Sequence, residues 1–268
     1  MMLKIFRIQT RFIIMSYKLI YQYPSIILGG FIEATVTVLS FYIFWQVVLT
    51  DQEFSSWALH EILIFSALGY LCWGIASFFF TGVWMLPFKI IEGEIERWLC
   101  RPLRHPLLGV LFEEVWVGGG AFFVVSTILL VIVSSYYHLQ YELHNLLIAF
   151  LVLILGMTTL YIIYATVSSF LGFTIGRAEF IQQAFDSLED NFVRIPVTTL
   201  PGGLKGILIF GYPVAFISAF PAEILLNRIE ITEAAFILLL IIPLCLFWLM
   251  MFLAVWRLGI KRYESASN

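Results

Sequence analysis

The densest group of ionisable side chains in this chain of 268 residues lies in a short polar segment between two apolar runs. Glu92, Glu94, Glu96 and Arg97 follow one another closely, and Arg101 comes soon after them. In a helix, Glu92 and Glu96 would stand one turn apart, and Glu94 and Arg97 would be neighbours on the helix surface. Charges grouped in this way predict either a surface that contacts a charged partner or an ordinary solvated loop helix.

The rest of the sequence contains no motif for catalysis or for cofactor binding. There is no GxxxxGK[ST] phosphate loop, and the nearest stretch, around Lys205, lacks the required spacing. There is no HExxH, no GxSxG and no Cys/His cluster. The histidines lie at the expected edges of membrane spans: His60, His105, His138 and His144. We therefore expect no enzyme activity, no metal and no cofactor in the chain itself, and no nucleic-acid partner.

The composition places these charges in a membrane protein. The chain is 61% hydrophobic and only 12% charged, whereas soluble domains carry about a quarter charged residues. Four runs contain no Asp, Glu, Lys or Arg: 62–86, 115–141, 145–176 and 234–256. Because about 20 apolar residues cross a bilayer as a helix, the expected fold class is an all-α integral membrane protein.

The apolar pattern predicts six transmembrane helices behind an N-terminal amphipathic helix. Residues 1–22 carry Lys4, Arg7, Arg11 and Lys18 as a narrow basic stripe, which suits the anionic surface of a membrane. A charged cap on a longer first span is the alternative. The spans, within a transmembrane domain of residues 23–268, are expected at 24–49, 62–86, 112–137, 145–176, 177–197 and 234–256.

The distribution of positive charge predicts the orientation, since lysine and arginine mark cytoplasmic loops. With six spans and a cytoplasmic N-terminus, 12 of the 15 basic residues fall inside and 3 fall outside. If 177–197 were a surface helix, five spans would remain and the basic C-terminal tail would lie outside. The charge rule disfavours that arrangement, so we expect both termini in the cytoplasm.

Residues 200–222 are too broken for an ordinary span. Gly202 and Gly203 free the backbone to turn, and Pro213 and Pro221 interrupt the apolar stretch. We expect a re-entrant pair of half-helices before the last span. Backbone of this kind within a membrane must be buried or line a cavity, so Pro213 and Pro221 are assigned to a gate at the outer end of a transport route.

Charged side chains inside the expected spans are candidates for the route itself. A carboxylate in the bilayer is costly and usually faces the bundle interior or water. Glu33 lies in the first expected span, and four residues of the fifth complete the set of pathway candidates: Asp186, Glu189, Asp190 and Arg194. The alternative is that the acids are protonated, or paired with arginines as packing contacts.

The polar segment 87–106 is expected to be a short amphipathic helix along the cytoplasmic face of the membrane. Pro87 suits a helix start, and Arg101-Pro102 suits its end. Ile91, Ile95 and Leu99 would anchor the helix and leave its charges facing a partner.

Two stretches resemble a known family. The run Gly93-Glu-Ile-Glu-Arg-Trp-Leu-Cys-Arg-Pro102-Leu resembles a segment of ABC transporter permeases of the type-2 exporter class. The run Tyr212-Pro-Val-Ala-Phe-Ile, with Phe220-Pro-Ala-Glu after it, resembles more narrowly a bacterial subfamily encoded as two permeases with one ATPase. The chain departs from those relatives in Arg194-Ile-Pro196, where an aromatic residue often precedes the proline, and in its acidic fifth span.

The resemblance implies that residues 92–102 form a coupling helix that docks on a separate ATPase. Its functional residues would be Glu92, Gly93, Glu94, Glu96, Arg97, Trp98, Arg101 and Pro102. It also implies an exporter subunit of the bacterial inner membrane, paired with an identical or paralogous permease and with two ATPase subunits that bind ATP and Mg. The alternatives are a proton- or cation-coupled secondary transporter or channel that uses Glu33 and the fifth-span acids, and a structural membrane subunit.

Overall fold

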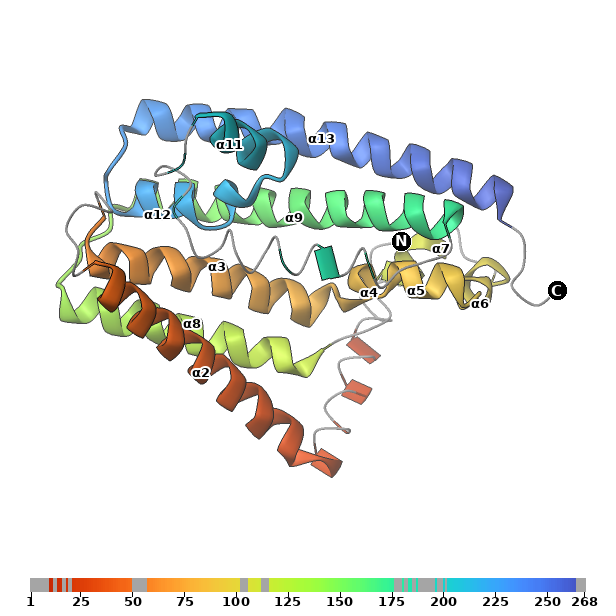
Figure 1. Ribbon diagram of the computed structural model, residues 1–268, viewed down its shortest axis with the longest axis horizontal. Coiled ribbons are helices and arrows are strands. Elements are labelled where there is room, and N and C mark those ends of the chain that lie inside the picture. Colours follow the sequence, from red (N-terminus) through yellow and green to blue (C-terminus); the bar gives the residue numbers. More distant parts are fainter. Residues whose placement is uncertain are drawn as a thin grey trace.

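The computed structural model describes residues 10–11, 14–15, 18, 21–49, 57–101, 106–111, 116–175, 180, 183–184, 187, 196, 200 and 202–263. All regular secondary structure in these residues is helical, without a strand. The long helices lie side by side as a bundle, with the shorter helices at its two ends (Figure 1). The expected all-α fold class is confirmed.

Five helices are long and apolar enough to cross a membrane. They are α2 (Pro24–Val48), α3 (Leu59–Phe79), α8 (Val117–Tyr136), α9 (Leu143–Thr174) and α13 (Ile231–Arg262). These correspond to five of the six expected spans. With 32 residues each, α9 and α13 are about 48 Å long and exceed the roughly 30 Å hydrocarbon core.

The expected fifth span, 177–197, and the N-terminal half of the expected amphipathic helix lie largely outside the described residues. The described residues between 10 and 22 are helical, and Arg11 and Lys18 among them are exposed. The count of six spans therefore stays a prediction.

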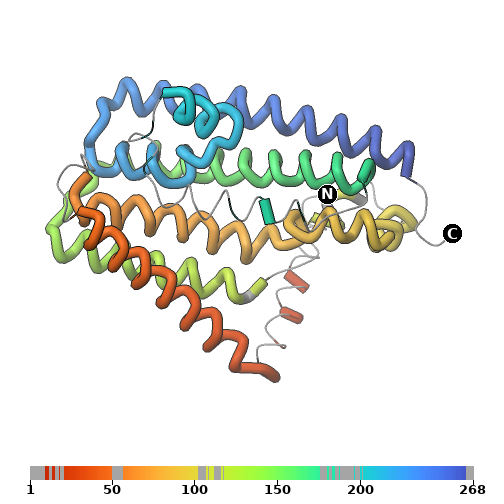
Figure 2. Tube along the Cα trace, viewed as in Figure 1, coloured from red at the N-terminus to blue at the C-terminus, as the bar shows by residue number. Residues whose placement is uncertain are grey.

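Close backbone approaches explain how the helices pack. Helix α3 packs along α8, α2 packs across α8 and also touches α3, and α9 packs along α13 (Figure 2). A Cβ on Gly74 of α3 would lie 3.0 Å from the carbonyl oxygen of Gly119 in α8, and one on Gly30 of α2 would lie 3.3 Å from the Cα of Gly118. Small residues let membrane helices approach in this way and gain packing contacts that lipid cannot provide.

A bent pair of short helices precedes α13. Gly202–Gly211 and Val214–Leu225 meet at 77°, and the pair comprises α11 (Gly202–Gly206), η2 (Ile207–Gly211), η3 (Val214–Phe216) and α12 (Ala219–Leu225). Pro213 sits at the bend, where it cannot continue a helical hydrogen-bond ladder. Both halves lie toward the end of the bundle where α9 and α13 begin (Figure 1). This course fits the expected re-entrant segment, and a sharply broken span has the same bend.

The two ends of the bundle differ in charge. One end, called here the basic end, contains the last turns of α3, α9 and α13 and the short helices that follow α3 (Figure 1). Six of its described residues are cations: Lys89, Arg97, Arg101, Arg257, Lys261 and Arg262. The opposite end, where α3, α9 and α13 begin, holds Arg228, which is paired with Glu61, together with Glu142 and Glu230.

Candidate coupling segment and pathway residues

The polar segment after α3 folds as several short helices and not as one helix over 87–106. These are α4 (Thr81–Trp84), α5 (Leu86–Ile91), α6 (Glu96–Leu99) and α7 (Pro106–Leu111). Gly93 interrupts the expected helix because its φ is 77°, in the left-handed region that glycine enters without steric cost. The expectation of a continuous helix over 92–102 is therefore wrong. The chain between Phe80 and Arg101 is called the coupling segment below.

The base of the coupling segment is buried. Ile95 has no exposed surface and Trp98 is 2% exposed. The Trp98 ring lies directly over Gly109 of α7, where any side chain would collide with it. Trp98, expected among the docking residues, is instead a core residue, and Ile91 and Leu99 are only half-buried. The anchors are thus Ile95 and Trp98, which sequence spacing did not separate from their neighbours.

Lys89 is also part of this base. It is 3% exposed, and its Nζ donates a hydrogen bond to the carbonyl oxygen of Val110 at 3.5 Å. The long lysine side chain thus joins α5 to α7, and a substitution that removes the amine would leave a buried carbonyl without this donor.

Above this base, charged side chains reach the surface. Glu92, Glu94, Arg97 and Arg101 are exposed, and they are called the charged face. The Arg101 guanidinium lies 4.5 Å from the centre of the Trp98 ring, so a cation–π contact joins the charged face to its buried anchor. Pro102 lies outside the described residues.

The coupling segment is attached to α9 by two contacts. The Tyr164 hydroxyl donates a hydrogen bond to the Trp84 carbonyl oxygen at 2.9 Å, and the two rings stack with centroids 4.4 Å apart. Further along, Gly172 leaves room for Ile90 of α5, since a Cβ there would lie 3.4 Å from Ile90 atoms. Both ends of α4–α5 are therefore held against the same long helix.

A third attachment runs to the end of α13. The Tyr263 hydroxyl donates a hydrogen bond to Glu96 Oε1 at 3.2 Å. Burial raises the pKa of Tyr263, and the hydrogen bond to Glu96 and the negative charge of that carboxylate raise the pKa further. The Tyr263 ring also packs edge-on against Phe173 of α9, which in turn meets Trp256. Glu96 thus points toward the bundle, unlike Glu92 and Glu94.

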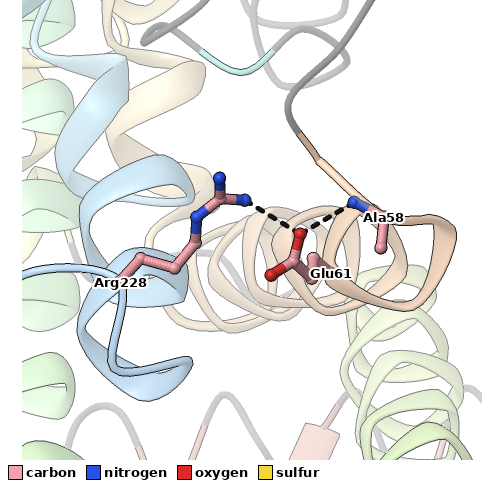
Figure 3. A network of polar contacts seen from close by, with 3 residues as sticks. All are labelled: Ala58, Glu61 and Arg228. Atoms are coloured by element: carbon pink, nitrogen blue, oxygen red, sulfur yellow. Dashed lines mark hydrogen bonds and ion pairs between the residues drawn. The ribbon is translucent and has the colours of Figure 1, made fainter. Parts of the chain in front are cut away.

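The opposite end has its own polar contact, which sequence reasoning missed. Arg228 Nη1 lies 2.8 Å from Glu61 Oε2, and the same oxygen accepts the Ala58 backbone N–H at 2.7 Å (Figure 3). The guanidinium stacks over Trp57 at 4.3 Å. Next to it, Asn145 donates to the Asn227 side chain. The sequence signal was a glutamate at the third position of α3, where it can cap a helix start.

The pathway candidates are not brought together by the described residues. Glu33 is exposed on α2, and the buried stripe that runs from Gly30 to Trp45 does not include it. Asp186, Glu189, Asp190 and Arg194 lie outside the described residues. Glu33 therefore lines no interior of this single chain, and its place on a route stays a prediction.

The expected gate residues are buried. Pro213 and Pro221 lie in the bent pair, where residues from Val214 to Ala219 have almost no exposed surface. A Cβ on Gly156 of α9 would collide with Phe216, so η3 lies directly against α9 at this point. Both prolines are buried in this single chain, and Pro221 also lines a cavity of about 610 Å³ between α3, α8, α9 and α12. Their assignment to an outer gate stays a prediction.

The comparisons with known proteins agree with this architecture. The family model for the ABC-2 family transporter protein matches residues 31–267, which is most of the chain and includes all five long helices in whole or in part. A search of curated proteins found no match. The match spans the bundle and the coupling segment together, and members of this family are membrane transport components that normally work with ATPase subunits. The chain therefore belongs to the ABC-2 transporter family and is a multi-pass permease component of an ABC transporter.

Proposed function

We propose that the chain is one half of an ATP-driven exporter and that its coupling segment docks on a separate ATPase subunit. A second permease, identical or paralogous, completes the route, and two ATPase subunits bind ATP and Mg. The observation that carries this proposal is the construction of the coupling segment, in which the charged face stands on a buried base that contacts α9 and α13.

This construction suits the transfer of a movement. Ile95 and Trp98 fix the base, so a push on Glu92 or Glu94 displaces the segment as one body. Tyr164 and Tyr263 then pass the displacement to the ends of α9 and α13. Packed interfaces of this kind shift between discrete arrangements and do not deform continuously.

The charges of the bundle support an orientation. The basic end holds six described cations, while Arg228 at the opposite end is paired with Glu61. Positive residues favour the cytoplasmic side of a membrane. We therefore place the coupling segment and both chain termini in the cytoplasm and the bent pair toward the outer face of a bacterial inner membrane.

Glu33 supports a second permease. A carboxylate on a lipid-facing surface of a spanning helix is costly, and Glu33 is exposed in this chain together with Leu28, Ile32 and Val36. A second permease that covers this face of α2, or a water-filled route between the two, would remove Glu33 from lipid. Glu33 is thus assigned to the boundary between the two permeases.

The proposal is tested by reversing charge on the charged face. The E92K/E94K double variant should reduce copurification of the ATPase about tenfold or more, since close charge pairs at interfaces contribute roughly 1.5 kcal/mol or more. The matched control is E230K/E233K, which reverses two exposed acids at the opposite end and should leave the yield unchanged.

Full ATPase recovery with E92K/E94K would contradict the docking assignment. Transport by the purified chain alone, driven by a proton or cation gradient without ATP, would favour the secondary transporter instead.

A further inference from the structure

A cavity of about 290 Å³ lies beside the joint between α3 and the coupling segment. Five aromatic side chains line it, contributed by α3, the α3–α4 joint, α4, the start of α8 and α9: Trp73, Phe80, Trp84, Trp116 and Tyr161. It is called the aromatic cavity. Met85 and Trp116, both more than a third exposed, are the most exposed residues of its lining.

The rings present surfaces in several directions. Trp73 and Trp116 stand nearly perpendicular, at 85°, with centroids 5.6 Å apart. Phe80 and Tyr161 form a second, tilted pair at 6.2 Å. Trp84 is held in place by its stack on Tyr164. Rings at different angles around one volume surround a ligand with both π faces and edges, which a flat aromatic surface cannot do.

Hydroxyl groups of the lining are already engaged. Ser77 Oγ donates to the carbonyl oxygen of Trp73 at 2.6 Å. Thr81 Oγ1 donates to the carbonyl oxygen of Ser77 at 2.5 Å and accepts the Trp116 backbone N–H at 3.0 Å. Among the described lining residues there is no charged side chain. A ligand in this cavity therefore meets aromatic rings but no ion-pair partner. The Ser77 and Thr81 hydroxyl protons are not available to it, because both are donated to backbone carbonyl oxygens.

These features select for one kind of charge. An anion would meet no cation and would be repelled by the ring faces. A primary ammonium brings three N–H donors. The oxygens of Ser77 and Thr81 can still accept hydrogen bonds, but two hydroxyl oxygens replace only part of the water shell that the ammonium loses. A quaternary ammonium has no N–H to satisfy, and its charge is stabilised by aromatic faces, Trp being the best of them.

We propose that the aromatic cavity binds a quaternary ammonium group, carried by a lipid headgroup or by a free organic cation. The bound group touches Phe80, Trp84 and Met85, which connect α3 to α5. A ligand bound there would therefore affect the position of the coupling segment. The binding itself does not depend on the proposed function, and it is tested without an ATPase.

The test measures binding of choline to the purified full chain in nanodiscs of phosphatidylglycerol. Its matched ligand is 3,3-dimethylbutan-1-ol, in which a carbon replaces the charged nitrogen while the shape is kept. Choline should bind saturably. The neutral alcohol should bind with an affinity at least about tenfold lower, because only choline has cation–π attraction.

Variants locate the site. Trp116 is partly exposed, so W116L should fold and should weaken choline binding about tenfold, whereas W116F, which keeps a ring, should lose less. The matched control is W248L, which removes a half-buried tryptophan of α13 outside the cavity and should bind choline as the unaltered chain does.

Nanodiscs of phosphatidylcholine separate the two sources. If free choline binds less tightly there, the lipid headgroup competes for the site; if its affinity is unchanged, the ligand is a free cation. Both results support the site. Equal binding of the neutral alcohol, unchanged binding by W116L, or no saturable binding would overturn it and leave the tryptophans as anchors at the membrane interface.

Discussion

The two regions of broken helix in this permease differ in which side chains they bury and which they expose. The coupling segment at the basic end and the bent pair α11–α12 each join long helices through short ones. The coupling segment buries Ile95 and Trp98 and leaves charged side chains exposed. The bent pair buries nearly every residue of its second half, including Pro213 and Pro221. Exposed charge suits the proposed contact with a partner, whereas the bent pair buries its second half against its own bundle.

The largest expected effect concerns the bent pair. A Cβ on Gly156 would lie 2.6 Å from the Phe216 Cβ and 2.8 Å from its backbone. G156A should therefore destabilise the chain by about 1–3 kcal/mol, the usual range for overpacking, and lower its thermal unfolding midpoint. The control is G29A, since a Cβ on Gly29 meets nothing within 4 Å. Equal midpoints for the two variants would show that η3 is not pressed against α9.

A smaller effect is expected from the contact between Glu61 and Arg228. Both side chains are partly exposed, and ion pairs in such positions contribute about 0–1 kcal/mol. Arg228 also stacks on Trp57, so R228M should cost more than E61Q. A double-mutant cycle of thermal stability should give a coupling energy below about 1 kcal/mol. A coupling energy above about 2 kcal/mol would mean that this pair, and not packing, holds the opposite end together.

An effect of similar size is expected from Tyr263. Y263F removes one hydrogen bond to Glu96 and keeps the ring on Phe173, so it should cost about 1 kcal/mol. Because the pKa of Tyr263 is raised in the folded chain, its contribution is complete below about pH 10, the ordinary pKa of tyrosine. The contribution is lost as the pH rises through the raised value.

Comparing thermal stability of the Y263F variant and the unaltered chain between pH 7 and 11 checks the sign. The difference should be constant up to about pH 10 and shrink above it. A difference that grows with pH in that range would contradict the hydrogen bond.

Uncharged runs in the sequence predicted where the long helices lie but not where they end. The run 62–86 contains no charge, yet α3 stops at Phe79 because Phe80 leaves the helical region with φ −121° and ψ 24°. Conversely, α13 continues beyond residue 256 to Arg262, since charged residues at its end can remain helical in the headgroup region. The absence of charge shows which residues a bilayer can hold, but local backbone geometry determines where each helix ends.

The coupling segment was predicted by composition and resemblance, but its internal structure was not. A helix interruption at Gly93 can be predicted from the sequence. The packing of Trp98 on Gly109 and the hydrogen bond between Tyr263 and Glu96 cannot, because they depend on contacts across the fold. Spacing in the sequence cannot show which of the three glutamates turns inward. The same limit applies to Glu33, whose helix was predicted while the exposure of its face was not.

The central claim is that the charged face, and no other surface of the permease, meets the ATPase. A photoreactive amino acid at position 94 tests it, with the same group at position 233 on the opposite end as the control, since both positions are exposed. After illumination in native membranes, the account predicts a covalent adduct with an ATPase subunit from position 94 and none from position 233. An adduct from position 233 alone, or no adduct from position 94 while the ATPase still copurifies, would contradict it.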